Sequence, residues 1–361
     1  MHLLINTGGG DAPGLNAVIR AVTLSAVRRG FRVTGIRRGY SGLLDGDGTG
    51  LVSLTRDVVR DITDRGGTLL GTVNRGQPFE YPMTDVDGTT VLGDVSDRVM
   101  SRYRELEADG LIAVGGDGSL RIASRFQEKG MRIIVVPKTI DNDLDSTEVS
   151  FGFDSAVSFA TDAIGRLHCT AEAHGRVMVV EVMGRYTGWI ALYAGLGGGA
   201  DAILIPEIPC DLTKVAQSIQ ERDAWGAHFS IVVVAEGAKE MGGSTSLVKQ
   251  ASIGRAERLG GMGHRVAAEL EEMTGKETRV VVLGHLQRGG SPTAFDRVLA
   301  TRFGGKAVEM LKAGETDRMV AFKPPSIGSV PLEEVVGKTR TVPLDFDVVR
   351  TARAIGVSFG D

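Results

Sequence analysis

Two aspartates stand two residues apart in the stretch PKTIDND, residues 137–143. Asp141 and Asp143 follow Lys138 and Thr139, directly after the apolar run RIIVV. Residues two apart in an extended segment tend to face the same side, so both carboxylates should enter one cleft. Carboxylates at close range push their proton affinities apart, so that one acts as a general base while the other stays ionised near a metal ion. The alternative is an Asx-rich turn without catalytic duty.

A second motif, GGDGS, ends another apolar run and opens a helical pattern. Its glycines leave room for phosphate groups beside the start of a helix, and Asp117 is positioned to reach a magnesium ion that bridges them. The stretch GGGDAPG near the N terminus has the same design, but neither it nor any other segment matches a dinucleotide fingerprint or a P-loop. Both motifs could instead be tight turns, with Asp117 as a cap.

Basic and acidic side chains follow three further apolar runs. Arg185 lies in EVMGRYTG, and His285 and Arg288 lie three apart in VLGHLQRGG, whose run begins at Arg279. Guanidinium groups suit bidentate binding of phosphate, so these residues fit a phosphomonoester site. Glu236, in AEG, could hold sugar hydroxyls. An ordinary salt bridge for Arg185 and a structural role for His285 are the alternatives.

These motifs need strands and helices to position them. Short β-branched runs, mostly continuous rather than alternating, predict strands covered on both faces. Segments 154–174 and 211–222 have helical spacing, and Asp211 is a plausible N-cap. Strand, glycine turn and helix in repetition predict an α/β fold whose ligands gather at the carboxyl ends of parallel strands. The runs are 2–6, 32–36, 111–116, 132–137, 176–182, 201–207, 229–237 and 279–285.

Composition narrows the class of protein. The 361 residues are enough for two domains, and 42% hydrophobic with 24% charged residues is typical of a globular protein. A net charge of −4 gives no reason to expect nucleic acid or an anionic membrane as a partner. Cys169 and Cys210 lack metal-ligand spacing, and no apolar run approaches a membrane span. We therefore expect a cytoplasmic protein without a disulfide or zinc site.

Taken in order, GGDGS, TIDND, MGR and GHLQRGGSP resemble the ATP-dependent 6-phosphofructokinase family, from residue 1 to about 310. The resemblance implies two three-layer α/β domains with mostly parallel sheets and an active-site cleft between them. Residues 1–150 and about 288–330 would bind the phosphoryl donor, and residues 151–287 and about 331–361 would bind the sugar. The implied reaction is phosphorylation of fructose 6-phosphate at its 1-hydroxyl by ATP and Mg²⁺, a step of glycolysis.

The resemblance also implies roles for individual residues. Asp141 would be the general base, Asp117 would hold magnesium, and Thr139, Asp143 and Arg185 would complete the catalytic group. The donor would bind to Gly10, Arg75, Gly115, Gly116, Gly118, Ser119 and Lys138. The sugar phosphate would bind to Thr139, Asp141, Arg176, Met183, Gly184, Arg185, Glu236, Arg279, His285 and Arg288. In the family two arginines reach across from a neighbouring subunit, and Arg176 and Arg279 stand in those positions, so a homotetramer or homodimer with shared sites is implied.

The sequence departs from the family at two positions. Asn74 stands where an arginine is frequent and Arg75 follows it, which leaves the role of Arg75 open. Leu24 occupies the position of an effector-binding arginine in allosterically regulated bacterial members, so the usual effectors are in doubt.

The phosphoryl donor has two readings. Members that use pyrophosphate usually carry aspartate after GGD, where this chain has Gly118 and leaves room for ATP. The same members carry a lysine before TID, and Lys138 is present. Because a glycine permits what an aspartate excludes, ATP is favoured and pyrophosphate is the alternative.

The function of the whole protein has a further alternative, a non-catalytic phosphosugar-binding regulator. NAD or lipid kinases would not explain MGR and GHLQRGG.

Overall fold

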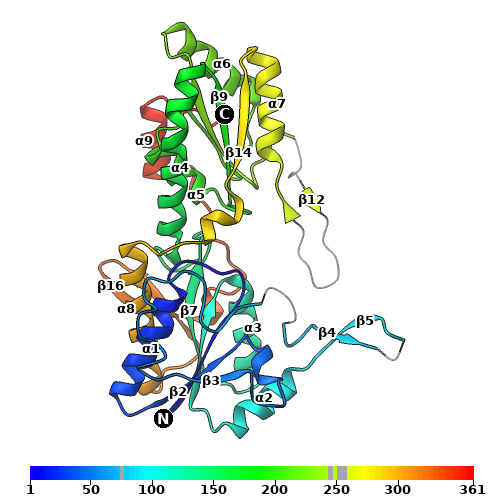
Figure 1. Ribbon diagram of the computed structural model, residues 1–361, viewed down its shortest axis with the longest axis vertical. Helices are drawn as coiled ribbons and strands as arrows, with labels where there is room; N and C mark the ends of the chain where they lie inside the picture. Colours follow the sequence, from blue (N-terminus) through cyan, green and yellow to red (C-terminus); the bar gives the residue numbers. More distant parts are fainter. Residues whose placement is uncertain (74–76, 86, 243–246, 250–257) are drawn as a thin grey trace.

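Two largely parallel sheets, each between two layers of helices, form the protein in the computed structural model (Figure 1). The structure describes residues 1–73, 77–85, 87–242, 247–249 and 258–361. Across the larger sheet the strands are β16 (Ser326–Pro331), β15 (Arg318–Lys323), β7 (Ile133–Thr139), β6 (Gly110–Gly115), β1 (His2–Thr7), β2 (Arg32–Ile36) and β3 (Leu51–Ser53), with β8 (Phe151–Gly152) paired to β7. Across the smaller sheet they are β10 (Ala202–Leu204), β11 (Ser230–Ala235), β9 (Val177–Val182) and β14 (Thr278–Val282).

The larger sheet is covered on both faces because its central strands are apolar along their whole length. β1, β6 and β7 pair in parallel, and every residue of β1 and β6 is buried. Leu3 and Ile5 belong to one core, while Leu4 belongs to the other. One face carries α1 (Leu15–Arg28) and α8 (Ala294–Lys312), and the opposite face carries α2 (Ser96–Glu105) and α3 (Asp117–Glu128) (Figure 1).

The smaller sheet is entirely parallel and has the same three-layer construction. Alternate residues of β9 enter two different cores, since Val180 and Val182 pack with one and Val177 and Val179 with the other. One face carries α4 (Phe153–His174), α5 (Trp189–Gly197) and α9 (Asp347–Ala354), and the opposite face carries α6 (Leu212–Ala224) and α7 (Met262–Thr274) (Figure 1).

All eight apolar runs of the sequence contain strands, so the predicted α/β class is confirmed. Asp211 caps α6 as predicted, because its carboxylate accepts a hydrogen bond of 2.9 Å from the backbone N–H of Thr213. Two runs are shorter than the pattern suggested. β10 ends at Leu204, and after β14 the residues GHLQR form a 3₁₀ helix, η2 (Gly284–Arg288), rather than an open turn.

Two hairpins and the end of the chain were not predicted. β4 (Tyr81–Thr84) and β5 (Thr90–Gly93) form an arm that projects from the body of the larger sheet (Figure 1), and β12 (Leu247–Lys249) pairs with β13 (Arg258–Leu259). β15 and β16 extend the larger sheet, after η3 (Leu332–Glu334) the chain crosses to the smaller sheet, and Ser358 there bridges to β10. No helix in the described residues is long and apolar enough to span a membrane.

Candidate active site

The carboxyl ends of the central strands of both sheets meet around one cavity of about 860 Å³. Contacts join the two sides directly, because the hydroxyl of Thr187, after β9, donates a hydrogen bond of 3.2 Å to the carbonyl of Asp141, after β7. The lining comes from the turns after β1, β6, β7, β9 and β14, together with residues near 40 and 78. This volume is typical of a site for a small-molecule ligand.

Asp141 and Asp143 both line the cavity, on either side of a residue with left-handed backbone. That residue, Asn142, has φ 52°, and its buried side chain accepts a hydrogen bond of 3.1 Å from the N–H of Ser150. Oδ1 of each aspartate is buried and makes no hydrogen bond within the described part of the chain. Buried polar atoms are nearly always satisfied in folded proteins, so these oxygens are arranged to meet a ligand.

Thr139 organises the pair from inside the turn. Its hydroxyl accepts a hydrogen bond of 3.1 Å from the N–H of Asp141, and the same hydroxyl acts to lower the pKa of Asp143. Thr139 therefore acts on both acidic residues.

Burial sets the acidity of the two carboxyl groups. Removal from water, followed by repulsion from Asp143, raises the pKa of Asp141 to about 7. Burial also raises the pKa of Asp143, although the hydroxyl of Thr139 opposes this shift. A carboxylate with a pKa near neutrality is a more effective proton acceptor than an ordinary aspartate, as general-base catalysis requires.

We predict that kcat/KM, measured at low concentrations of both substrates, falls about tenfold per pH unit below pH ~7. Asp141 accepts a proton only when ionised, so activity is lost as the pH drops through its pKa of about 7. A competitive sugar-phosphate inhibitor provides the control, because its binding reports ionisation of the phosphate but not of the base. An acid limb below pH ~5, the range of an unperturbed aspartate, would contradict the assignment.

Lys138 and Arg288 meet the glycine turn after β1. The ammonium of Lys138 donates to the carbonyl of Gly10, and the guanidinium of Arg288 donates a hydrogen bond of 3.0 Å to the carbonyl of Asp11. A side chain at Gly10 would collide with Arg288, because its Cβ would lie 2.8 Å from Nη1. Burial and the charge of Arg288 lower the pKa of Lys138 to about 8. Two cations thus stand at the edge of the glycine turn, where an anion can bind.

The motif GGDGS forms the start of α3 at the cavity wall. Gly116 is the N-cap, and Asp117, Gly118 and Ser119 make the first turn. The N–H groups of a first turn have no partners within the helix, so this end of a twelve-residue helix attracts phosphate. Gly115 lies behind the lining, buried as the last residue of β6, where Ser119 fills the space beside it.

The residues present could hold magnesium only together with phosphate oxygens and water. Asp117, Asp141 and Asp143 bring hard carboxylate oxygens to the cavity, which suit this cation. No group of three or more metal-ligating side chains occurs in the described ranges, so phosphate oxygens and water would have to complete the coordination. Magnesium commonly binds in that way, through one or two carboxylates and substrate phosphates.

The loop after β9 brings Met183, Gly184 and Arg185 toward the same site. Gly184 has φ 139°, and a Cβ there would lie 2.6 Å from the carbonyl of Thr187, so only glycine fits. Arg185 lines the cavity, and Met183, partly buried, packs on the core beneath the loop. Burial and the neighbouring Glu181 raise the pKa of Glu236, and the charges of Arg288 and Arg185 oppose that rise. Glu236 therefore belongs to the same electrostatic group, though it does not line the cavity.

Besides Met183, Gly184 and Glu236, three further predicted sugar-phosphate residues lie outside the cavity lining of this chain. His285 is exposed on η2, whereas Arg288, at the other end of the same short helix, lines the cavity. Arg176 directly precedes β9 and Arg279 is the second residue of β14, so at about 3.3 Å per residue they lie about 20 Å and about 10 Å from the carboxyl ends of those strands. Arg75 lies outside the described residues.

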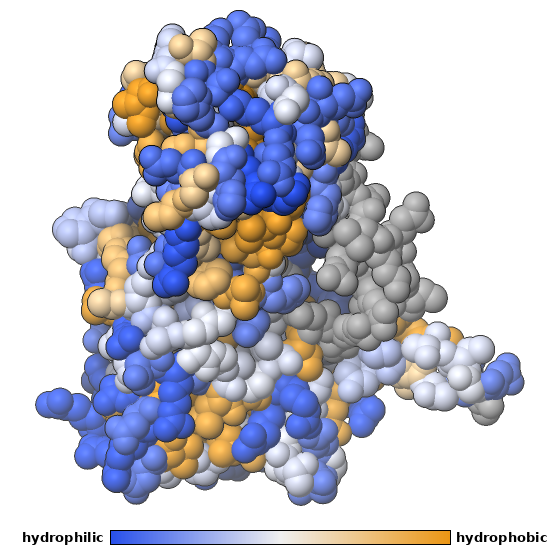
Figure 2. Space-filling view, turned by 45° about the horizontal axis from the view of Figure 1, so that its top comes forward, coloured by the Kyte–Doolittle hydropathy of each residue, from blue (hydrophilic) through white to orange (hydrophobic). Residues whose placement is uncertain are grey.

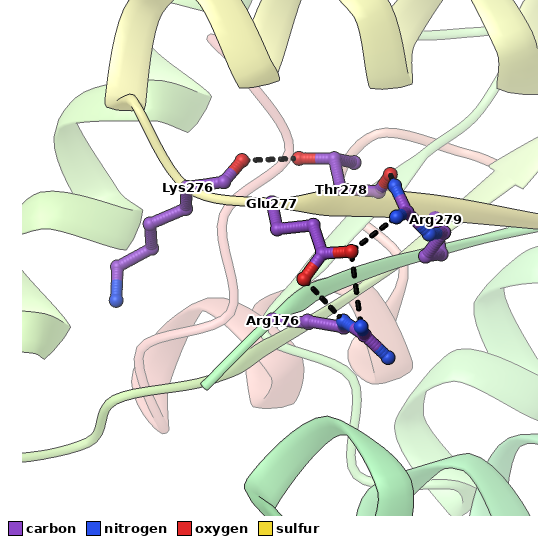
Figure 3. A network of polar contacts seen from close by, with 5 residues as sticks. All are labelled: Arg176, Lys276, Glu277, Thr278 and Arg279. Atoms are coloured by element: carbon purple, nitrogen blue, oxygen red, sulfur yellow. Dashed lines mark hydrogen bonds and ion pairs between the residues drawn. The ribbon is translucent and has the colours of Figure 1, made fainter. Parts of the chain in front are cut away.

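Glu277 holds the two distant arginines together (Figure 3). Its carboxylate accepts hydrogen bonds of 2.7 and 3.0 Å from Arg176 and is also paired with Arg279. The hydrogen bond from Arg176 is the main reason why the pKa of Glu277 is lowered. The result is a partly exposed basic pair that does not line the cavity of its own chain.

Sequence reasoning missed several lining residues. Arg121 pairs with Asp117 over 2.9 Å, and Arg125 lies over the ring of Phe79 at 3.7 Å. The signal for Arg121 was available, because a residue four positions after Asp117 shares its helix face. Tyr40 gave no such signal, since it reaches the cavity only through the pairing of distant segments.

Three features of the cavity are those of a phosphotransferase site. They are a helix start suited to phosphate, a turn with two carboxylates of which one has a pKa near 7, and several cationic side chains in the lining. The sequence profile described as "Phosphofructokinase" matches residues 2–311. The chain is 50% identical to the ATP-dependent 6-phosphofructokinase of Chloroflexus aggregans, over 98% of this chain and 96% of that protein. It is 46% identical to ATP-dependent 6-phosphofructokinase 2 of Clostridium perfringens, over 99% and 98% respectively. The chain belongs to the phosphofructokinase family.

Solved structures have the same fold. Phosphofructokinase from Saccharomyces cerevisiae superimposes with a TM-score of 0.79 at 30% identity over 92% of this chain, and the chain spans 45% of the yeast chain. The pyrophosphate-dependent phosphofructokinase from Marinobacter aquaeolei also superimposes with a TM-score of 0.79, at 22% identity over 96% of this chain and 87% of that one. The second likeness concerns the fold alone.

Proposed function

We propose that this protein transfers the terminal phosphoryl group of ATP to the 1-hydroxyl of fructose 6-phosphate, as its glycolytic relatives named ATP-dependent 6-phosphofructokinase do. The observation that carries the proposal is Asp141, a cavity-lining carboxylate whose pKa is raised to about 7 and whose Oδ1 is buried without a partner. Product formation with ATP or with pyrophosphate, each with magnesium, tests the donor. Activity with pyrophosphate alone would overturn it.

In this proposal Asp141 accepts the proton of the sugar 1-hydroxyl as its oxygen bonds to the terminal phosphorus of ATP. The bond from that phosphorus to the β-phosphate oxygen breaks, and ADP leaves with the bonding electron pair. Thr139 holds the turn at Asp141 through its hydrogen bond and opposes the rise in the pKa of Asp143. Arg185 and Arg288 lie beside the cavity and stabilise negative charge on the transferring group. Bound magnesium, held by Asp117 and phosphate oxygens, would neutralise charge on the donor. Alignment and positive charge are the main requirements of phosphoryl transfer, because its transition state needs little covalent assistance.

The donor phosphates would lie along the glycine turn after β1 and the start of α3. Gly10, Gly116, Gly118 and Ser119 line the cavity there, with the glycines leaving space for phosphate groups, and Lys138 adds a positive charge. A Cβ added at Gly118 meets no atom within 4 Å among the described residues, so this position leaves room for a nucleotide. We accordingly propose residues 1–150 and about 288–330 as the donor-binding part and the rest as the sugar-binding part.

The cytoplasm remains our proposed location, in keeping with the free thiols of Cys169 and Cys210.

Arg176 and Arg279 complete the site of a neighbouring subunit in this proposal. They face outward as a pair on Glu277, at the end of the smaller sheet opposite its own cavity. An apolar area lies on the surface where the two bodies meet (Figure 2), and four large apolar residues within 282–298 are exposed. These exposed residues are Val282, Leu286, Phe295 and Val298. Apolar surface of this kind favours a subunit contact.

Mixing two inactive variants tests the shared site. Asp141→Asn should lack the base, and Arg279→Ala should bind fructose 6-phosphate weakly. When the two are dissociated together and reassembled, some interfaces combine an intact Asp141 with an intact Arg279. We expect the mixture to recover about a quarter of the wild-type activity, while each variant treated alone recovers none beyond its own residual level. A mixture no more active than Arg279→Ala, or a fully active isolated monomer, would contradict the proposal.

A further inference from the structure

The crossing segment after η3 touches both active-site loops. The N–H of Arg340 donates a hydrogen bond of 2.9 Å to the carbonyl of Asp143, and Thr339 bridges to Leu144. The carbonyl of Arg340 accepts a bond of 3.0 Å from the indole of Trp189, which follows the Arg185 loop. Residues 339–342 therefore lie between the carboxylate turn and that loop.

Glu207 connects the same segment to the Arg185 loop. Its Oε1 accepts hydrogen bonds from the N–H of Gly188 at 3.0 Å and from the N–H of Val342 at 2.9 Å. Burial raises the pKa of Glu207, and the two backbone donors oppose that rise. This carboxylate is kept in a poorly hydrated position, and among the described residues its hydrogen-bond partners are backbone N–H groups, which indicates a structural task rather than contact with a ligand.

The last contact returns to the base. Thr187, 1% exposed, precedes Gly188 and donates its hydroxyl to the carbonyl of Asp141. The hydrogen bonds thus form a closed ring, from the carboxylate turn through residues 339–342, Glu207 and Gly188 to Thr187 and back to Asp141. The ring thus holds the carboxylate turn at two backbone carbonyls, those of Asp141 and Asp143.

We propose that Glu207 and residues 339–342 form a brace that positions Asp141 for proton transfer, with Glu207 as a positioning residue. The proposal rests on the proposed function, in which Asp141 is the base. The brace gives the carboxyl-terminal part of the chain a role in turnover, since it ties the carboxylate turn of one sheet to the arginine loop of the other. A misplacement of about 1 Å at a reacting group can cost up to about 10²-fold in rate.

Glu207→Ala removes the acceptor for two buried N–H groups. We expect kcat to fall about 10- to 100-fold, KM for each substrate to change less than about threefold, and the acid limb to move to lower pH as Asp141 becomes hydrated. Glu207→Gln keeps an oxygen for both donors and should retain kcat within about threefold. Thr187→Val should lower kcat while Thr187→Ser retains it, and this nearly isosteric pair tests the brace even if Glu207→Ala folds poorly.

Asp201→Ala is the matched control for stability. Asp201 accepts a hydrogen bond of 2.8 Å from the N–H of Ile231 and pairs with Arg222, at the other end of β10. The Asp201→Ala variant should lower Tm by about as much as Glu207→Ala does. Its kcat per folded molecule and the acid limb of its pH profile should be unchanged. Normal kcat in both Glu207→Ala and Thr187→Val, or equal losses in Glu207→Gln and Glu207→Ala, would overturn the brace. Retained turnover in Asp141→Asn would instead overturn the base itself, so the two failures are distinguishable.

Discussion

Asp141→Asn is expected to lower kcat by at least about 10²-fold, since a positioned general base contributes ~10²–10⁴-fold. The amide is similar in size but cannot accept the proton of the sugar hydroxyl. Binding of fructose 6-phosphate should survive, because in the proposed function arginines, and not this side chain, hold the phosphate. Steady-state kinetics and calorimetric titration with fructose 6-phosphate measure the two effects separately.

The same substitution should raise thermal stability at pH 8. A folded-state pKa of about 7, above the ordinary value, means that the native protein holds a proton that the unfolded chain releases. Stability therefore falls as the pH rises from about 4 to about 7, and above pH 7 the ionised Asp141 destabilises the fold. Removing that charge should increase Tm by about 2 °C or more. Asp145→Asn, outside the cavity lining formed by the described residues, is the control and should change neither quantity. Near-normal turnover in Asp141→Asn would refute the base.

Gly118→Asp is expected to reduce kcat/KM for ATP by at least about 10²-fold. The new carboxylate would repel the α-phosphate of ATP. Two like charges 4 Å apart at a partly hydrated site repel by about 4 kcal/mol, which is more than the roughly 2.7 kcal/mol that a 10²-fold loss requires. The fold should tolerate the change, because a Cβ at this position meets no described atom within 4 Å and an acidic residue suits the first turn of α3. The loss should therefore appear in donor use while Tm stays within about 2 °C.

Gly118→Asn separates charge from size. It adds almost the same volume without the negative charge, so we expect a loss of less than about tenfold with ATP. Both variants should also be assayed with pyrophosphate, which has no α-phosphate to be repelled. Equal losses in the aspartate and asparagine variants would show that steric exclusion, and not charge, governs the donor site.

Local sequence predicted the elements that position the site. Continuous apolar runs such as 132–137, which are short, rich in β-branched residues and followed by turn residues, favour buried strands over helices. Glycine and aspartate directly after such runs mark turns at the carboxyl edge of a parallel sheet, which is why Asp117, Asp141 and Gly118 were found before the fold was known. The extension of the sheet by β15 was missed because its pairing with β7 depends on a segment far earlier in the chain. The β4–β5 hairpin pairs neighbouring segments, but its strands are mostly exposed and carry no continuous apolar run that would mark them.

The sequence by itself determined which residues could do chemistry and that they follow strands, because apolar patterning and turn residues are local properties. Only the tertiary structure decided how those residues meet. It buried Lys138 against Gly10, raised the pKa of Asp141 and carried Arg176 and Arg279 to the opposite end of their strands. It also laid residues 339–342 across two loops. Burial, electrostatic neighbours and long-range hydrogen bonds exist only once distant segments have packed, so no local pattern encodes them.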